Sequence, residues 1–265
     1  MSTIAFLSLV NDRAQFADCQ ASLRAIAEPF PEWLMVEPNL HGWNAAQGLN
    51  HGLNRLEADW VVCIHQDVQF PPEFWRKLTT ALRALPSDVA VAGIVGCEKN
   101  GTYRGHIHDP NGHCFWGGMP HDVAALDEVV IAVRKSSGLR FCEDVPGFHC
   151  YGADFCYTAV EKGHRVVVID APLVHLSTGK IDASYEKASK WLMAKWGAKY
   201  RWLLPTPTML LKDEARIGFF AHFWQRWNRR RDRKRRNTND CGDPNCRASM
   251  LAIYERARAA LSKKA

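Results

Sequence analysis

The sequence predicts an α/β protein in which a mostly parallel central sheet has helices on both faces and is followed by a C-terminal helical extension. Six short apolar runs have the composition of strands buried on both sides: 4–10, 33–38, 60–68, 89–97, 129–133 and 165–170. Segments with apolar residues at helical spacing lie between several of these runs, and such alternation favours a parallel sheet. The 265 residues suffice for one domain of this kind with an appendage. We therefore expect a main domain at residues 1–180 and a basic helical extension at residues 181–265.

Four helices are predicted within the main domain: 16–27, 45–56, 72–85 and 154–162. The first ends before Pro29, and the last ends at Gly163. Pro72 suits the first turn of the third helix. Between Cys97 and Asp122 the pattern gives way to Gly, His, Asn and Pro, which predicts a long loop.

The composition is that of an ordinary globular protein, with 47% hydrophobic and 23% charged residues. No apolar stretch reaches the roughly 20 residues of a membrane span. The apolar run at residues 4–10 has no positive leader before it and fits a first strand better than a signal peptide. Nine scattered cysteines without an export signal indicate reduced thiols in a cytoplasmic protein. Cys241 and Cys246 look like a loop clasp, but two ligands do not make a zinc site.

The positive charge of the chain is concentrated in one segment. The formal net charge is +6, and Arg226 to Arg236 alone contribute +7, so the rest of the chain is nearly neutral. Residues 216–236 join an aromatic cluster to this basic run. The pattern suits a helix on an anionic membrane surface near a lipid-linked acceptor. It also suits an aromatic face packed on the main domain, with a solvated charged end.

Polar residues follow two of the predicted strands. His65, Gln66 and Asp67 end one apolar run, and Asp170 and His175 follow another. In open α/β sheets, ligands bind outside the carboxyl ends of the strands. Asp67 supplies the hard oxygen that a divalent ion prefers. The alternative for Asp67 is a cap on the turn before Pro71-Pro72, and His175 alone could equally be a structural residue.

Four local patterns give the chain a family resemblance: Asn50-His51-Gly52-Leu53, His65-Gln66-Asp67, the stretch from Gly147 to Asp154, and His175-Leu176-Ser177. Over residues 4–180 the chain resembles the family 2 glycosyltransferases with the GT-A fold. It looks closest to the glycosyltransferase-like branch in which a His-Gln-Asp motif stands in place of D-x-D. It departs from the family pattern at Leu49, where an Arg is frequent, at His65, which replaces an acid, and at Ala153, which replaces a Glu.

The resemblance implies a metal-dependent, inverting transferase that moves a sugar from a nucleotide-diphosphate donor to a hydroxyl of a saccharide or lipid-linked saccharide. Asp67 and His175 would then hold Mn²⁺ or Mg²⁺, with His65 ligating the ion or contacting the ribose. Asp154 matches the acid that serves as general base, although a carboxylate at this place also fits a plain helix cap.

Nucleotide binding would fall to the ends of the first two strands and to the Asn-x-Gly element. We expect Asn11, Asp12, Glu37, Asn50 and His65 to take part in it. The predicted loop carries several aromatic and polar residues that suit an acceptor sugar: His106, His108, Asp109, His113, Trp116 and His121. The alternative for this loop is a solvated segment with incidental histidines.

Two other functions remain open from the sequence. The departures at His65 and Ala153 fit a non-catalytic family member. The basic tail fits a binding protein that contacts anionic membrane or nucleic acid. A nucleic-acid partner is disfavoured, because the main domain has neither a recognisable nucleic-acid module nor a net positive charge. We expect a cytoplasmic protein, with peripheral contact at the inner face of the membrane through residues 216–236.

Overall fold

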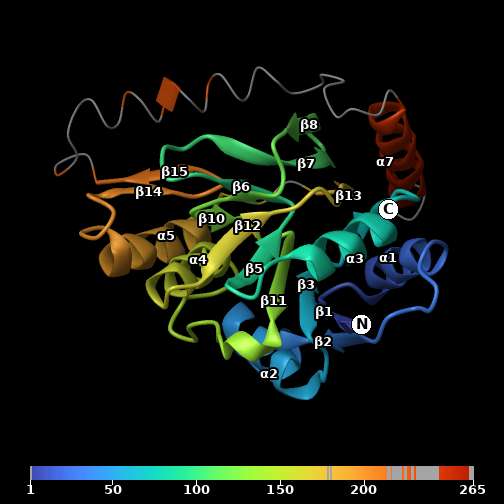
Figure 1. Ribbon diagram of the computed structural model, residues 1–265, viewed down its shortest axis with the longest axis horizontal. Helices are drawn as coiled ribbons and strands as arrows, with labels where there is room; N and C mark the ends of the chain where they lie inside the picture. The colour runs from blue at the N-terminus through green and yellow to red at the C-terminus, as the bar shows by residue number, and fades with distance from the viewer. Residues whose placement is uncertain are drawn as a thin grey trace.

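A seven-stranded mixed sheet forms the centre of the protein (Figure 1). The computed structural model describes residues 2–177, 179, 181–213, 216, 223, 226, 227, 230 and 245–262. The sheet has the strand order β2 (Trp33–Val36), β1 (Ile4–Leu9), β3 (Trp60–Ile64), β11 (Val130–Arg134), β5 (Val89–Gly93), β12 (Arg165–Val168) and β9 (His121–Asp122). Strands β11 and β9 run antiparallel to their neighbours, and the other five strands share one direction.

Helices cover both faces of this sheet. Helices α1 (Arg13–Arg24) and α3 (Phe74–Ala84) pack on one face, and α2 (Ala45–Arg55) and α4 (Tyr151–Glu161) pack on the other. Strand β3 is apolar on both faces of the sheet. Val62 packs in the hydrophobic cluster under α1 and α3, and Val61 packs in the cluster under α2 and α4. Asn44 opens α2 with a capping box, in which its side chain accepts from the N–H of Gln47.

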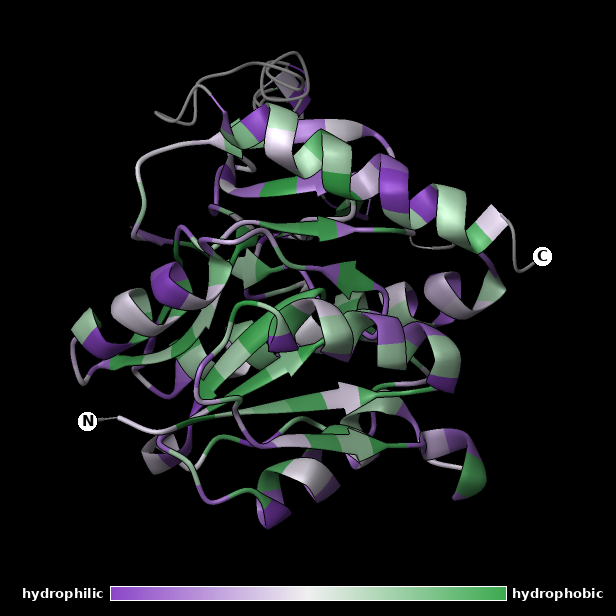
Figure 2. Ribbon diagram, turned by 90° about the vertical axis from the view of Figure 1, so that its right-hand side faces the viewer, coloured by the Kyte–Doolittle hydropathy of each residue, from purple (hydrophilic) through white to green (hydrophobic). Residues whose placement is uncertain are grey.

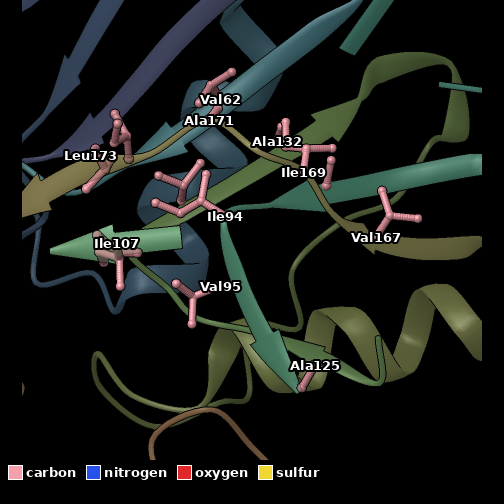
Figure 3. Packing of buried hydrophobic residues seen from close by; sticks show 14 of the residues in the cluster. Val62, Ile94, Val95, Ile107, Ala125, Ala132, Val167, Ile169, Ala171 and Leu173 are labelled. Atoms are coloured by element: carbon pink, nitrogen blue, oxygen red, sulfur yellow. The ribbon is translucent and has the colours of Figure 1, made fainter. Parts of the chain in front are cut away.

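A second sheet packs against the central one. Its strand order is β10 (Ala125–Leu126), β6 (Val95–Cys97), β7 (Tyr103–Asp109), β13 (Leu173–His175) and β4 (Val68–Gln69), and β8 (Gly112–Trp116) pairs with β7. Val62 and Ala132 of the central sheet lie in one apolar cluster with Val95 and Ile107 of the second sheet (Figure 3). This packing fixes how the ends of β3 and β13 approach each other.

The prediction of one long loop between Cys97 and Asp122 is wrong. This region forms the β7–β8 hairpin and the short strand β9, joined by connecting turns. The reason is that His106, His108 and His113 are buried, whereas their polarity suggested a solvated segment. The predicted strands 60–68 and 89–97 are each divided, at His65 and Ile94, between the two sheets.

The C-terminal part contains α5 (Ala183–Trp196), the antiparallel pair β14 (Leu203–Pro205) and β15 (Leu210–Lys212), and α7 (Cys246–Ser262). Helix α5 buries Tyr185, Leu192 and Trp196 in the same hydrophobic cluster as the central sheet. The two strands were not predicted from the sequence, and the domain boundary at residue 180 stays a prediction. Short 3₁₀ helices are formed by Pro38–Leu40 and Lys135–Ser137.

Apolar residues concentrate on the strands, whereas α7 alternates apolar and polar residues along its length (Figure 2). Helix α7 lies against β7, β8, β13 and β4, and its Met250 is buried with Val174. Among the helices that the structure describes, none combines the length and apolar character of a membrane span.

Candidate active site

Three side chains that can bind a metal converge at the end of β3. His65, Asp67 and His175 each offer a ligand atom, and these atoms lie within 4.8 Å of one another. Asp67 Oδ1 is 3.7 Å from His65 Nδ1 and 3.3 Å from His175 Nε2. The two imidazole nitrogens are 3.4 Å apart. The sequence predicted these three residues as one group, and the structure brings them together.

Strand pairing produces this convergence across 110 positions of the chain. Strand β13 runs antiparallel to β4 and sets His175 opposite Val68, so that its imidazole lies beside Asp67. The N–H of Leu176 donates to the carbonyl of Asp67 at 3.0 Å, and the Ser177 hydroxyl donates to Asp67 Oδ2 at 2.5 Å. The backbone and the carboxylate of Asp67 are therefore both held by the segment after β13.

The surroundings keep Asp67 ionised. Burial by itself would raise the pKa of Asp67, but the hydrogen bond from His175, the nearby imidazoles and the Ser177 hydroxyl hold it well below its ordinary value. Burial lowers the pKa of His65. For His175, burial lowers the pKa, but the hydrogen bond to Asp67 and the nearby carboxylate charges together outweigh it, so its pKa is raised. One carboxylate oxygen and two imidazole nitrogens form a donor set that fits Mn²⁺ and suits Mg²⁺ less well.

Two cavities meet at this cluster. The larger has a volume of about 690 Å³ and is lined by residues that include Tyr103, Trp116 and His175. The smaller has a volume of about 430 Å³ and lies at the carboxyl ends of β1 and β3. His65, Glu128 and Phe148 line both cavities. A molecule in the smaller cavity and a molecule in the larger one would thus face each other across His65 and Glu128.

The smaller cavity includes part of the predicted nucleotide site. Asn11 lines it, together with Pro38 and Asn39. Asp12 instead caps α1, and its Oδ1 accepts from the N–H of Gln15 at 3.0 Å. The position of the first loop is set by Gln66, a residue to which the sequence analysis gave no role.

Gln66 joins the end of β3 to the turn after β1. Its Oε1 accepts from the N–H groups of Asn11 and Asp12 at 2.9 and 3.1 Å. Its Nε2 donates to Asn11 Oδ1 and, at 3.1 Å, to Gln15 Oε1. A side-chain amide can satisfy two donors and two acceptors in this way, which explains the use of Gln at this position.

Glu37 and Asn50, also predicted in the nucleotide site, do not line either cavity. Glu37 forms a two-point ion pair with Arg13, with contacts of 2.8 and 2.5 Å. Asn50 is buried and holds the segment before α4, because it donates to the carbonyl of Phe141 at 2.9 Å and accepts from its N–H at 3.0 Å. The contacts of these two residues are with other parts of the chain, and neither residue lines a cavity.

Asp154 does not face the cavities. It is fully buried in the first turns of α4, and its Oδ1 accepts from Trp196 Nε1 at 2.6 Å and pairs with Lys195 Nζ at 2.8 Å. Both partners belong to α5, which covers the carboxylate. This placement does not fit the general-base role that the resemblance implied, because α5 covers the carboxylate and Asp154 lines neither cavity.

Glu128, which the sequence analysis did not single out, has the properties expected of a base. It precedes β11 and lines both cavities. Burial raises the pKa of Glu128 to about 8, against the opposing effect of the Gly152 N–H, which donates to its Oε1 at 3.0 Å. The sequence signal was an acidic pair, Asp127-Glu128, directly before an apolar strand.

The β7–β8 hairpin has two distinct faces. Tyr103, Ile107 and Asp109 line the larger cavity, with Trp116 from β8. His106, His108 and His113 do not line it, because side chains alternate between the two faces of a strand. The expectation that this region lines an acceptor site therefore fits its aromatic face, and the histidines belong to the opposite face.

Comparisons with known proteins find a matching family model and a curated relative. Residues 19–138 match the family model described as Glycosyl transferase family 2. A curated relative, the protein of ATP synthase subunits region ORF 6 from Fuscovulum blasticum, is 28% identical over 220 residues, which is 77% of this chain and 86% of the relative.

Two solved structures share the fold at low sequence identity. One is mannosyltransferase PcManGT from Pyrobaculum calidifontis, in complex with GDP-Man and Mn²⁺; it has a TM-score of 0.51 and 11% identity, over 99% of this chain and 79% of that chain. The other is glucosyl-3-phosphoglycerate synthase from Mycobacterium tuberculosis, in complex with Mg²⁺ and UDP; it has a TM-score of 0.50 and 13% identity, over 74% of this chain and 80% of that chain.

Proposed function

Because the chain is a family 2-like glycosyltransferase with a GT-A fold, we propose that it transfers a sugar, with inversion, from a nucleotide-diphosphate donor to a hydroxyl of a saccharide or lipid-linked saccharide. One observation carries the proposal. The ligand atoms of His65, Asp67 and His175 converge where a cavity at the carboxyl ends of β1 and β3 meets a larger cavity. The complexes of the two structural neighbours with GDP-Man and Mn²⁺ and with UDP and Mg²⁺ support this choice of donor.

The donor nucleotide would occupy the smaller cavity, next to Asn11 and Asn39. Gln66 supports this role, since it ties the loop after β1 to the end of β3 and keeps Asn11 in place. Asp12 and Asn50 would contribute by fixing the backbone around the cavity, Asp12 through the start of α1 and Asn50 through the segment at Phe141.

Asp67, His175 and His65 would hold the divalent ion. When bound, Mn²⁺ or Mg²⁺ neutralises the charge that develops on a leaving diphosphate. The two imidazoles favour Mn²⁺ over Mg²⁺. The Ser177 hydroxyl keeps the carboxylate of Asp67 turned toward the cluster, so the oxygen ligand is oriented before any ion arrives.

The acceptor would occupy the larger cavity. Tyr103 and Trp116 stack at 5.1 Å between ring centroids and offer an apolar wall on which a sugar ring can lie. Asp109 lines the same cavity and can accept hydrogen bonds from sugar hydroxyls. The proposal leaves open whether the acceptor saccharide carries a lipid.

We assign the general base to Glu128 in place of Asp154. Glu128 lines both cavities, so it can take a proton from an acceptor hydroxyl while that hydroxyl attacks a donor in the smaller cavity. A pKa of about 8 makes its carboxylate a stronger base than an ordinary glutamate. The attack on the face opposite the leaving diphosphate inverts the anomeric centre. Glu128 also compensates for the departure at Ala153, because it supplies an acid from the segment before β11.

The donor assignment is tested by thermal denaturation of the purified chain with a panel of nucleotide sugars, each with and without Mn²⁺. We expect at least one nucleotide sugar to raise the Tm in a Mn²⁺-dependent manner, and Asp67→Ala to abolish that rise. Asp144→Ala is the control, because Asp144 is an exposed aspartate outside both cavities. A panel without any shift, or a shift that survives Asp67→Ala, would contradict the proposal.

The cytoplasmic location and the membrane contact stay predictions. Of the predicted membrane segment 216–236, only residues 216, 223, 226, 227 and 230 lie within the described part of the chain. If the segment binds anionic vesicles, its deletion should abolish binding, and the remaining protein should keep its donor-induced Tm rise. Vesicle binding that survives the deletion would rule out this role for the segment.

A further inference from the structure

We propose that His106, His113 and Cys246 bind a zinc ion that fastens helix α7 to the β7–β8 hairpin. One ligand atom from each of the three side chains lies within 4.8 Å of the other two. All three residues are buried, at 0%, 0% and 3% exposure. The cluster is separate from the glycosyl-transfer site, because none of its members lines either cavity.

The hairpin supplies the two imidazoles. In the β7–β8 register, His106 pairs with Phe115, and His108 pairs with His113. His106 and His113 are therefore diagonal neighbours on the hairpin face that looks away from the larger cavity. Their rings lie at 90° to each other, with centroids 5.2 Å apart.

Helix α7 supplies the thiol from its first residue. Cys246 Sγ is 3.1 Å from His106 Nε2. Tetrahedral zinc with ordinary Zn–N and Zn–S bonds would set such a nitrogen and sulfur about 3.6 Å apart. The required movement is a few tenths of an ångström. Cys241, which has C-x4-C spacing with Cys246, lies outside the described residues.

A second group of residues orients His106. Its Nδ1 is 2.8 Å from Asp170 Oδ1, and Lys77 Nζ donates to Asp170 Oδ2 at 2.7 Å. With Nδ1–H donating to the carboxylate, Nε2 presents its lone pair toward Cys246 and His113. A carboxylate that fixes the tautomer of a ligating histidine is a recurrent feature of zinc sites. Asp170 thus acquires a positioning role, although it lies at a strand end like Asp67.

The donor types select the metal. Two imidazoles and one thiolate suit Zn²⁺ and are poor ligands for Mg²⁺. The apolar interface of α7 gives a structural reason for such a site, because among the residues that the structure describes its buried cluster is small: Val174, Cys246 and Met250 with a few half-buried neighbours. A zinc ion that joins α7 to the second sheet would supplement this small contact.

The test uses the full chain, purified with an affinity tag that lacks histidine and analysed for metals by mass spectrometry. We expect about one zinc per chain in the wild type. The stoichiometry should persist in the Asp67→Ala/His175→Ala double variant and fall below one tenth in Cys246→Ser and His113→Asn. His108→Asn is the matched control, since His108 is a buried histidine of the same hairpin outside the cluster.

Two further measurements do not depend on the folding of ligand variants. Cobalt added to the metal-free wild type should give a thiolate-to-metal charge-transfer band, and zinc should displace it. Asp170→Asn keeps all three ligands and should weaken zinc binding about 10–100-fold. A wild type that binds neither zinc nor cobalt would show a purely hydrogen-bonded cluster and overturn the proposal. Full zinc content in both Cys246→Ser and His113→Asn would overturn it as well. Neither result depends on whether the protein transfers a sugar.

Discussion

The backbone N–H of Gly152 donates a hydrogen bond of 3.0 Å to Oε1 of Glu128, and the Glu128 side chain packs directly against Cα of Gly152. A Cβ at position 152 would lie 2.7 Å from Cγ of Glu128, closer than real Cβ contacts come. The glutamate therefore fills the volume that a side chain at the start of α4 would otherwise occupy. Its carboxylate also faces the amino end of that helix, where backbone N–H groups favour an anion.

Replacement of Glu128 by Gln should abolish most of the transfer activity without loss of donor binding. The amide cannot take the acceptor proton, so we expect kcat to fall by about 10²–10⁴-fold. The Mn²⁺-dependent Tm rise with the nucleotide sugar should remain, because Glu128 is not among the three clustered metal-binding side chains. Glu143→Gln is the control, since Glu143 is an exposed glutamate outside both cavities, and its side-chain oxygen accepts from Asn50. An active Glu128→Gln enzyme would remove Glu128 from the mechanism.

The pH dependence of the reaction should report the raised pKa of Glu128. The base is the ionised form, so kcat/KM should rise with pH through about 8 and level off above it. An ordinary glutamate would give its rise near its usual value of 4.5. The residual activity of Glu128→Gln should not show this rise of kcat/KM with pH. Initial rates from about pH 6 to about pH 9 provide the measurement, and a flat wild-type profile would exclude the assignment.

Alanine at position 152 should displace Glu128. The added Cβ would contact both Glu128 Cγ and Ile131 Cδ1, at 2.7 and 3.0 Å. We expect a loss of about 1–3 kcal/mol in the free energy of unfolding, as for other overpacked sites. A lower kcat and a shift in the pH at which kcat/KM rises should accompany this loss, because the Glu128 carboxylate is displaced from its position between the cavities. A change in stability with an unaltered pH profile would mean that Gly152 serves packing alone.

Asp154→Asn should affect stability more than catalysis. The substitution removes the carboxylate that pairs with Lys195 Nζ at 2.8 Å. Trp196 Nε1 donates to the same carboxylate oxygen, so this hydrogen bond is weakened as well. We expect a loss of about 1–3 kcal/mol, less than for a fully buried pair, because Lys195 is one-third exposed. Chemical denaturation measures the loss, and Lys195→Met in the same background should add little. If kcat of the folded Asp154→Asn protein falls as far as that of Glu128→Gln, Asp154 is the base.

The main elements could be predicted from the sequence because their patterns are local. Runs such as Trp60–Ile64 are apolar throughout, and a strand with both faces buried requires this. Asn44 marks the start of α2 through its capping box. The prediction of the GT-A fold is confirmed by the structural neighbours. The hairpin after Cys97 escaped prediction because its buried face carries imidazoles, and local polarity does not reveal that a helix distant in sequence covers them.

The sequence by itself determined that Asp67 and His175 stand at the ends of strands, because strand ends are set by local composition. Only the tertiary structure decided which acid lines a cavity. Asp154 and Glu128 are both carboxylates near α4, but α5 covers the first while two cavities open on the second. Exposure to a cavity depends on which distant element packs on a residue. That is a property of the folded chain as a whole, and no spacing within a segment encodes it.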